Sequence, residues 1–228
     1  MKLALLYSGG KDSNYALYKA SKKHEIVCLI SLISQNSHSY MFQSPGTKLT
    51  SYQSDALGIP LLEHTTKGEK ERELEDLEDA IKKAIDEYSI EGIVTGAIDS
   101  IYQASRIQKI CNKFNLWCFN PIWQKDQIEF LEELIQNNFE IVIVGIASYP
   151  FNEKYLGRKI DNKLLIELLD LQKRYKINPA GEGGEIETFV LDSPCFKKRI
   201  KITKSRKNMD SQNSGELVID NLEMEDKK

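Results

Sequence analysis

Short apolar runs alternate with helix-like segments over the first two thirds of the chain. The runs at 2–7, 25–33 and 139–146 are almost wholly apolar, which predicts strands that are covered on both faces. The segment 71–88 instead carries apolar residues along one helical face and charged residues along the other. Strands that alternate with helices in this way predict a doubly wound, mostly parallel sheet with helices on both sides, and hence an α/β fold.

The alternation ends near Ser148, where a Tyr-Pro-Phe-Asn sequence follows. An amphipathic helix is predicted at 164–175, and strand-like pieces come after it. We therefore predict an α/β domain over residues 1–147, a smaller C-terminal α+β domain over 148–223 and a disordered tail over 224–228. Strands of the smaller domain are predicted at 188–191, 199–203 and 216–222, with a polar loop at 204–214.

The sequence Ser-Gly-Gly-Lys-Asp-Ser lies between the first predicted strand and the first predicted helix. A helix N-terminus offers unpaired N–H groups to an anion, and glycines let the backbone approach it closely. The spacing matches neither a Walker A loop nor the GxGxxG fingerprint. We predict a polyphosphate-binding loop, the alternative being a turn that only caps the helix. The predicted contacts are Ser8, Gly9, Gly10, Lys11, Asp12 and Ser13.

A second loop, from Gly96 to Ser100, follows the predicted fourth strand. Ligands of open α/β sheets gather at the carboxyl ends of strands, so this loop is expected to border the same crevice. Asp99 either binds magnesium or the incoming nucleophile, or caps the helix that follows. Arg106, about two turns into that helix, either reaches a phosphate or forms a surface ion pair.

A glycine turn carries three carboxylates, those of Glu182, Glu185 and Glu187. Like charges held close together repel one another, which favours a metal ion or an organic cation beside them. The alternative is a solvated turn before a strand. We therefore predict that this turn forms part of a functional site.

Together these motifs resemble those of the PP-loop ATP pyrophosphatases, and most closely the diphthine–ammonia ligase branch. The resemblance extends from Met1 to about Leu222, and it departs from the family at 41–46, where related sequences tend to carry His and Asn. It implies an adenine nucleotide α-hydrolase-like fold. The residues that carry it are SGGKDS at 8–13, GAIDS at 96–100 with Arg106, LGRKID at 156–161 and GEGGEIETFVLDSP at 181–194.

The resemblance implies an enzyme that splits ATP into AMP and pyrophosphate, with Mg²⁺, and joins ammonia to a carboxylate. The implied acceptor is diphthine on translation elongation factor 2, and the implied nitrogen source is free ammonium. Adenine is expected beside Ser31 and Ile33, and Gly96 and Arg106 are expected near the nucleotide. Asp99, Glu182 and Glu185 are the candidate catalytic residues. The candidates for binding the substrate are Tyr102, Tyr149 and Glu187, because a trimethylammonium group is attracted by aromatic faces and carboxylates. Trp123 and Phe151 are further aromatic residues near the expected site. For each of these aromatic residues, packing in the core is the alternative.

Composition bears on the partners of the protein, on its location and on the role of its cysteines. The net charge of −3 does not predict a strongly basic face for nucleic acid, and no apolar run approaches the roughly 20 residues of a membrane span. No signal peptide is evident, so a cytoplasmic protein is expected. The four cysteines form no CxxC pair and are expected to be structural. Two other functions stay open: another PP-loop adenylating enzyme, such as one that modifies tRNA, and a non-catalytic ATP-binding module.

Overall fold

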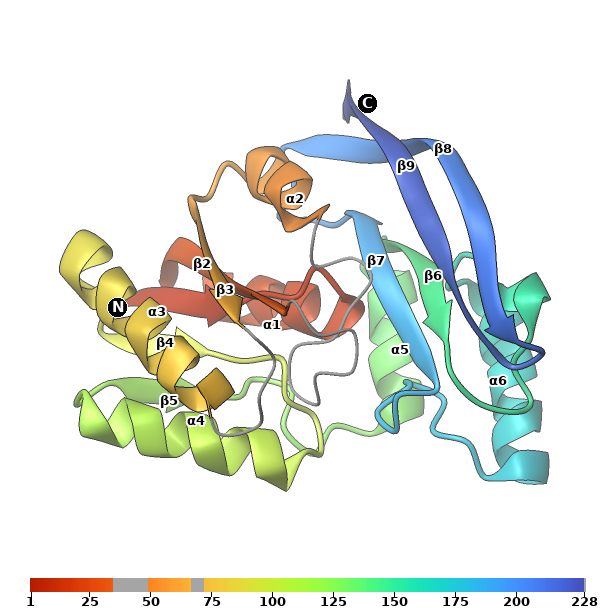
Figure 1. Ribbon diagram of the computed structural model, residues 1–228, viewed down its shortest axis with the longest axis horizontal. Coiled ribbons are helices and arrows are strands. Elements are labelled where there is room, and N and C mark those ends of the chain that lie inside the picture. The colour runs from red at the N-terminus through yellow and green to blue at the C-terminus, as the bar shows by residue number, and fades with distance from the viewer. Residues whose placement is uncertain (35–48, 67–71, 228) are drawn as a thin grey trace. The chain divides into compact units, whose positions relative to one another are not determined.

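Two units, Met1–Trp123 and Gln124–Lys228, make up the chain in the computed structural model. The structure describes residues 1–34, 49–66 and 72–227, so the predicted departure from the family at 41–46 lies outside the described residues. Each unit has its own sheet (Figure 1). Each also has its own buried apolar residues.

The first unit contains a five-stranded sheet of order β3-β2-β1-β4-β5, in which every neighbouring pair is parallel. The order reverses between β1 and β4, which creates a topological switch point where ligands of such sheets bind. The predicted doubly wound α/β fold is therefore confirmed. The strands are β1 (Lys2–Leu6), β2 (Glu25–Ser34), β3 (Leu61–Thr66), β4 (Gly92–Val94) and β5 (Trp117–Phe119).

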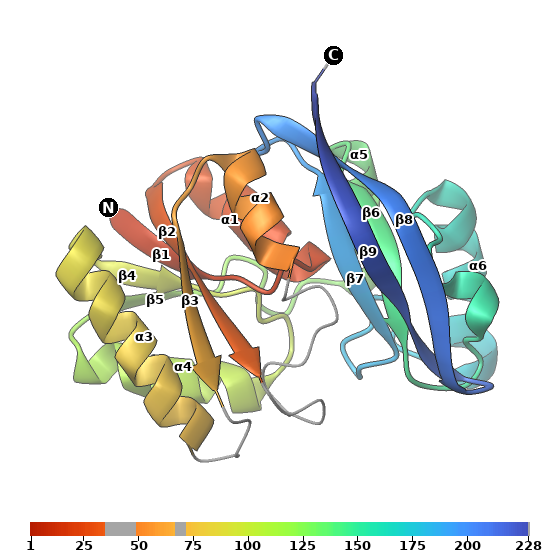
Figure 2. The same cartoon turned by 45° about the horizontal axis from the view of Figure 1, so that its top comes forward.

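Helices cover both faces of this sheet (Figure 2). Leu77 and Ile81 of α3 and Ile110 of α4 are buried in one apolar cluster with strand residues, whereas Tyr15 and Leu17 of α1 are buried outside that cluster. The helix α2 was not predicted, because its eight residues carry no long apolar face. The helices are α1 (Lys11–Ser21), α2 (Thr50–Leu57), α3 (Arg72–Tyr88) and α4 (Ile101–Lys113).

The second unit combines an antiparallel sheet of order β7-β6-β9-β8 with two α-helices and a short 3-10 helix, η2 (Glu153–Tyr155). Asp126 caps the start of α5, because its carboxylate accepts hydrogen bonds from the N–H groups of Ile128 and Glu129. The elements are α5 (Gln127–Gln136), β6 (Glu140–Ile146), α6 (Asn162–Tyr175), β7 (Ile186–Asp192), β8 (Lys198–Ser211) and β9 (Ser214–Asp226).

The boundary between the units differs from the one predicted near residue 148. The apolar strand β6 was taken as the last strand of the parallel sheet, but it pairs antiparallel with β7 and β9 in the second unit. A continuous apolar run indicates that a strand is buried on both faces, and it carries no information on which sheet the strand joins. The division therefore falls between Trp123 and Gln124.

The C-terminal hairpin is longer than predicted. Residues 204–211, taken as part of a loop, continue β8, and residues 224–226, taken as the start of a disordered tail, continue β9. The reason is cross-strand charge: β8 is basic and β9 acidic, and Lys201 and Glu225 form an ion pair at 2.8 Å. The polar composition of 204–211 and 224–226 suggested solvated segments. Opposite charges on the paired strands β8 and β9 instead stabilise their pairing.

At the start of β6, Glu140 accepts hydrogen bonds from Arg199 and Lys159. Burial alone would raise the pKa of Glu140, but the hydrogen bonds and charges of these two partners outweigh it and lower that pKa. Within the described parts of the chain, no helix has the length and apolar character needed to cross a bilayer.

Candidate functional site

The predicted phosphate loop joins β1 to α1 at the switch point of the parallel sheet. Gly10 is the N-cap residue of α1, and no side chain caps this helix end. Gly9 has a φ of 81°, a left-handed conformation that favours glycine. The hydroxyl oxygens of Ser8 and Ser13 lie 3.4 Å apart beside the loop. The loop therefore presents hydroxyls and an uncapped helix start, which together suit a polyphosphate.

A buried asparagine fixes the shape of this loop. The side-chain amide of Asn14 donates hydrogen bonds to the carbonyl oxygens of Gly9 at 3.2 Å and Gly10 at 2.9 Å. Its own oxygen accepts a hydrogen bond from the Tyr7 hydroxyl at 2.9 Å. These hydrogen bonds fix the carbonyl oxygens of Gly9 and Gly10 toward the Asn14 side chain.

The helix α2 supports the same loop from the other side. Gln53 donates a hydrogen bond to the carbonyl oxygen of Gly9 at 2.9 Å, and the Thr50 hydroxyl donates to the Ser31 hydroxyl at 3.4 Å. Ser31 is fully buried and Ile33 is half-buried near the carboxyl end of β2. Sequence reasoning missed Asn14, Thr50 and Gln53, because no motif marks residues that act by supporting a loop.

Lys11 is buried, and its ammonium group lies 3.0 Å from both carboxylate oxygens of Asp12. The two charges therefore offset each other at the start of α1. Asp12 provides no side-chain cap for the helix.

The second predicted loop packs directly against the first. A Cβ atom added to Gly96 would lie 2.8 Å from the carbonyl carbon of Asp12 and 2.8 Å from the amide nitrogen of Ser13. Only glycine lets the two backbones approach this closely. Ser100 accepts a hydrogen bond from the N–H group of Gln103 at 3.3 Å and is the N-cap of α4. The capping alternative for Asp99 is therefore wrong, and Asp99 is exposed.

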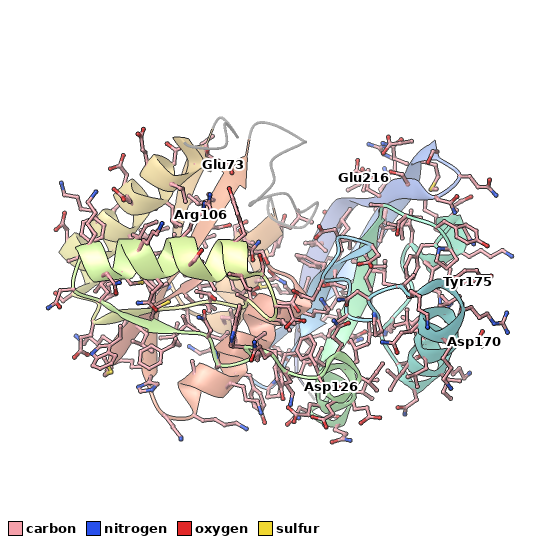
Figure 3. The ribbon with its side chains drawn as sticks, turned by 90° about the horizontal axis from the view of Figure 1, so that it is seen from below. Glu73, Arg106, Asp126, Asp170, Tyr175 and Glu216 are labelled. Carbon is pink, nitrogen blue, oxygen red and sulfur yellow. The ribbon has the colours of Figure 1, made fainter. Side chains whose placement is uncertain are left out.

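Arg106 and Tyr102 lie one turn apart on α4, and the Arg106 guanidinium carbon is 3.4 Å from the centroid of the Tyr102 ring. The sequence suggested that Arg106 either reaches a phosphate or forms a surface ion pair, and stacking on Tyr102 is a third interaction. Arg106 is labelled in Figure 3. Its Nε atom is buried and has no hydrogen-bond acceptor among the described residues.

In the second unit, the acidic turn is built on glycines. The N–H group of Gly184 donates to the carbonyl of Gly181 at 2.9 Å, and these glycines have φ values of 82° and 76°. A Cβ atom on Gly181 would lie 2.6 Å from the Ile186 side chain, so the turn is closed against the start of β7. Glu182 and Glu187 are half-buried in this turn and at the start of β7.

Backbone N–H groups hold Glu185 at two points. Its Oε1 atom accepts a hydrogen bond from the N–H group of Asn178 at 3.0 Å, and its carbonyl oxygen accepts one from Ala147 at 3.1 Å. Its Oε2 atom is buried without a hydrogen-bond donor in the described part of the chain. A carboxylate in this setting is fixed in position and retains capacity for a cation or a proton.

The candidate substrate-binding aromatic residues fall into two classes. Phe151 is fully buried and packs edge-on against Tyr155, so for this residue core packing is confirmed. Tyr149 is 63% exposed, and its ring lies 5.1 Å from that of Tyr175 at an interplanar angle of 84°. The hydrogen bond to Tyr175 raises the pKa of the Tyr149 phenol.

The described residues contain no group of three or more His, Cys, Asp or Glu side chains arranged to hold a metal ion. Burial raises the pKa of the Cys28 thiol to about 12. A hydrogen bond between Cys111 and Cys118 raises the pKa of Cys111 and lowers that of Cys118. All four cysteines are free thiols.

Two family models together match most of the chain. The diphthamide synthase N-terminal domain family matches residues 1–117, and the diphthamide synthase C-terminal domain family matches residues 126–223. The diphthine–ammonia ligase of Bos taurus is 35% identical over 225 residues, which cover 90% of this chain and 84% of that protein. The diphthine–ammonia ligase of Homo sapiens is 34% identical over the same shares of the two chains.

A solved structure, described as a predicted subunit of tRNA methyltransferase from Methanocaldococcus jannaschii, covers 85% of this chain and 98% of its own. Its sequence identity to this chain is 21% and its TM-score is 0.43. The two matched domains and the full-length relatives are decisive: the chain belongs to the diphthamide synthase family.

Proposed function

We propose that the protein is an ATP-dependent ligase that converts the diphthine carboxylate on translation elongation factor 2 into an amide. The observation that carries this proposal is the meeting of the two loops at the switch point between β1 and β4. There α1 begins at Gly10 without a side-chain cap, and Gly96 packs on the backbone of its first turn. Such a helix start favours polyphosphate, and the relatives named diphthine–ammonia ligase indicate the acceptor.

In the proposed reaction, a carboxylate oxygen of diphthine attacks the α-phosphorus of ATP. The bond from that phosphorus to the oxygen bridging it to the β-phosphorus breaks, so pyrophosphate leaves and an acyl-adenylate forms. Ammonia then attacks the acyl carbon, and the bond to the AMP oxygen breaks, which yields the amide and AMP. Ammonium must lose a proton before it attacks, and a nearby carboxylate is a suitable acceptor.

The first unit is proposed to hold the nucleotide. Adenine lies beside Ser31 and Ile33, and Gly96 and Arg106 approach the phosphates. Magnesium arrives with ATP, because this ion is commonly held by phosphate oxygens and only one or two carboxylates, of which Asp99 is the candidate. The phosphate contacts are Ser8, Gly9, Gly10, Lys11, Asp12 and Ser13.

The carboxylates of the acidic turn are proposed to act on the second half-reaction. Glu182 and Glu185 either accept the proton of ammonium or balance the positive charge of the substrate, and Asp99 positions the attacking group. Glu187, Tyr102 and Tyr149 are proposed to contact the substrate. Since the proposed acceptor is a translation factor, we place the reaction in the cytoplasm.

Replacement of one carboxylate separates the two roles. If Glu185 is the base, Glu185→Gln leaves acyl-adenylate formation intact and stops amide formation. If Glu185 is a counter-ion, the variant binds the modified factor more weakly while its dependence on ammonium is unchanged. A wild-type rate of the complete reaction in both Glu182→Gln and Glu185→Gln would exclude a catalytic role for the turn.

The two alternative functions give different results in the same assay. A tRNA-modifying enzyme would release pyrophosphate with tRNA and not with the modified factor. A non-catalytic module would bind ATP and release pyrophosphate with neither acceptor.

A further inference from the structure

Two tyrosines of the second unit form an open aromatic corner. Tyr149 is 63% exposed and Tyr175 is 41% exposed, yet their rings touch at a centroid distance of 5.1 Å and are nearly perpendicular. Tyr175, at the end of α6, is labelled in Figure 3. Single exposed aromatic side chains are ordinary, but a pair that offers two walls to solvent is a feature of cation-binding sites.

The same two segments that carry these rings also hold Glu185. Ala147, just before Tyr149, donates its N–H group to the carbonyl oxygen of Glu185 at 3.1 Å. Asn178, just after Tyr175, donates its N–H group to the Glu185 carboxylate at 3.0 Å. The aromatic corner and the carboxylate are therefore parts of one local structure within the second unit.

Among the described residues, neither the tyrosine pair nor the Glu185 carboxylate has a cationic partner. No lysine or arginine among the described residues stacks on the ring of Tyr149 or Tyr175, and none forms an ion pair with Glu185 there. The Glu185 Oε2 atom has no hydrogen-bond donor among those residues either. By contrast, the Tyr102 ring already has the Arg106 guanidinium stacked on it.

We infer that Tyr149, Tyr175 and Glu185 form the binding site for a quaternary trimethylammonium group of the substrate. Such a group has no N–H to donate, so it is recognised by aromatic faces and by a nearby negative charge, not by hydrogen bonds. The inference rests on the proposed function, because diphthine is the substrate group that carries a trimethylammonium. It adds Tyr175 to the candidate residues. The aromatic corner of Tyr149 and Tyr175 then selects the trimethylated substrate over one whose amine lacks the methyl groups.

The first test measures binding without turnover. Choline is added to the full-length protein with ring-labelled tyrosine, and the tyrosine NMR signals are assigned with Tyr149→Phe and Tyr175→Phe. We expect choline to shift the signals of both rings, and Tyr149→Leu or Tyr175→Leu to weaken its binding by roughly three- to tenfold, whereas the Phe variants keep it. Glu185→Gln should also weaken the binding of choline.

The neutral isostere 3,3-dimethylbutan-1-ol provides the charge control. It has the shape of choline without the positive charge, so its binding should be much weaker. Equal binding of the two molecules would show an apolar contact surface and overturn the inference. An absence of choline-dependent shifts at Tyr149 and Tyr175 would overturn it as well.

The second test measures turnover with the modified factor. The Leu variants should raise KM for the trimethylated factor without changing KM for ATP, and this increase should be absent for a factor whose amine lacks the methyl groups. Trp117→Leu removes an aromatic residue of similar exposure, 65%, from β5 and should change neither value. An equal rise in KM for both factors would contradict methyl recognition. If the wild-type protein releases no AMP with the trimethylated factor, the proposed function fails, while the choline experiment still decides the site.

Discussion

The close packing of Gly96 on the phosphate loop predicts a large effect from one added methyl group. In Gly96→Ala, the new Cβ atom would lie 2.8 Å from backbone atoms of Asp12 and Ser13. Ordinary contacts between such atoms need about 3.5 Å, so the two loops must separate by roughly 0.7 Å. Overpacking of this kind costs about 1–3 kcal/mol in the free energy of unfolding.

The displacement should also reach the nucleotide, because the shifted atoms belong to the first turn of α1. Misplacement by about 1 Å can reduce a catalytic rate by roughly 100-fold. We therefore expect Gly96→Ala to weaken ATP binding and to lower kcat/KM for AMP release by roughly 10- to 100-fold. Calorimetric titration with a non-hydrolysable ATP analogue, urea unfolding and an AMP assay measure these three quantities.

Gly92, the first residue of β4, provides a matched control. A Cβ atom there would lie 2.8 Å from the carbonyl oxygen of Trp117, at the amino end of β4 and away from the phosphate loop. Gly92→Ala should therefore lower the free energy of unfolding by a similar amount and leave the affinity of the folded protein for ATP unchanged. Equal losses of ATP affinity in the two variants, or none in Gly96→Ala, would refute the reasoning.

Three further predictions concern the loop, the thiols and an ion pair. Asn14→Leu should destabilise the protein by about 2–4 kcal/mol, because it removes three buried hydrogen bonds. A double-mutant cycle with Tyr7→Phe, measured by urea unfolding, should give a coupling energy of about 1 kcal/mol, whereas strict additivity would exclude the hydrogen bond between Tyr7 and Asn14. Cys28, whose pKa is raised to about 12 by burial, should resist iodoacetamide at pH 8 and be alkylated more slowly than Cys118 in the native protein, as mass spectrometry can show. The pKa of Glu140 is lowered, so the stabilisation that its ion pairs provide is present above its unfolded pKa and is lost as the pH falls through the folded pKa. Glu140→Gln should therefore lower the free energy of unfolding by about 1 kcal/mol at pH 7, and the difference between the two proteins should vanish in acid. Equal free energies of unfolding at pH 7 would show that the ion pairs contribute nothing.

The parallel sheet and the strand–glycine–helix arrangement around Gly9 could be predicted because their signals are local. A buried strand, a Gly-Gly turn and a helix start follow one another directly in the sequence there. The sequence also placed Gly96 at a strand end, where parallel topology brings such loops together.

The remaining features depend on partners that are distant in sequence. Gln53 reaches Gly9 from a helix without a motif, and β6 joins the second sheet through β7, far along the chain. The last residues of β9 are ordered by the basic residues of β8, although their own composition is typical of a tail. Pairing of this kind is set by tertiary contacts that override local propensity.

In the proposed function, the protein splits ATP between the α- and β-phosphorus to activate a carboxylate on elongation factor 2. The most direct test supplies ATP, magnesium, ¹⁵N-ammonium and purified factor carrying diphthine, and follows all products together. We expect AMP and pyrophosphate in equal amounts, with one ¹⁵N atom appearing as an amide on the factor for each AMP. Release of ADP and orthophosphate, or of AMP and pyrophosphate without label in the factor, would contradict it.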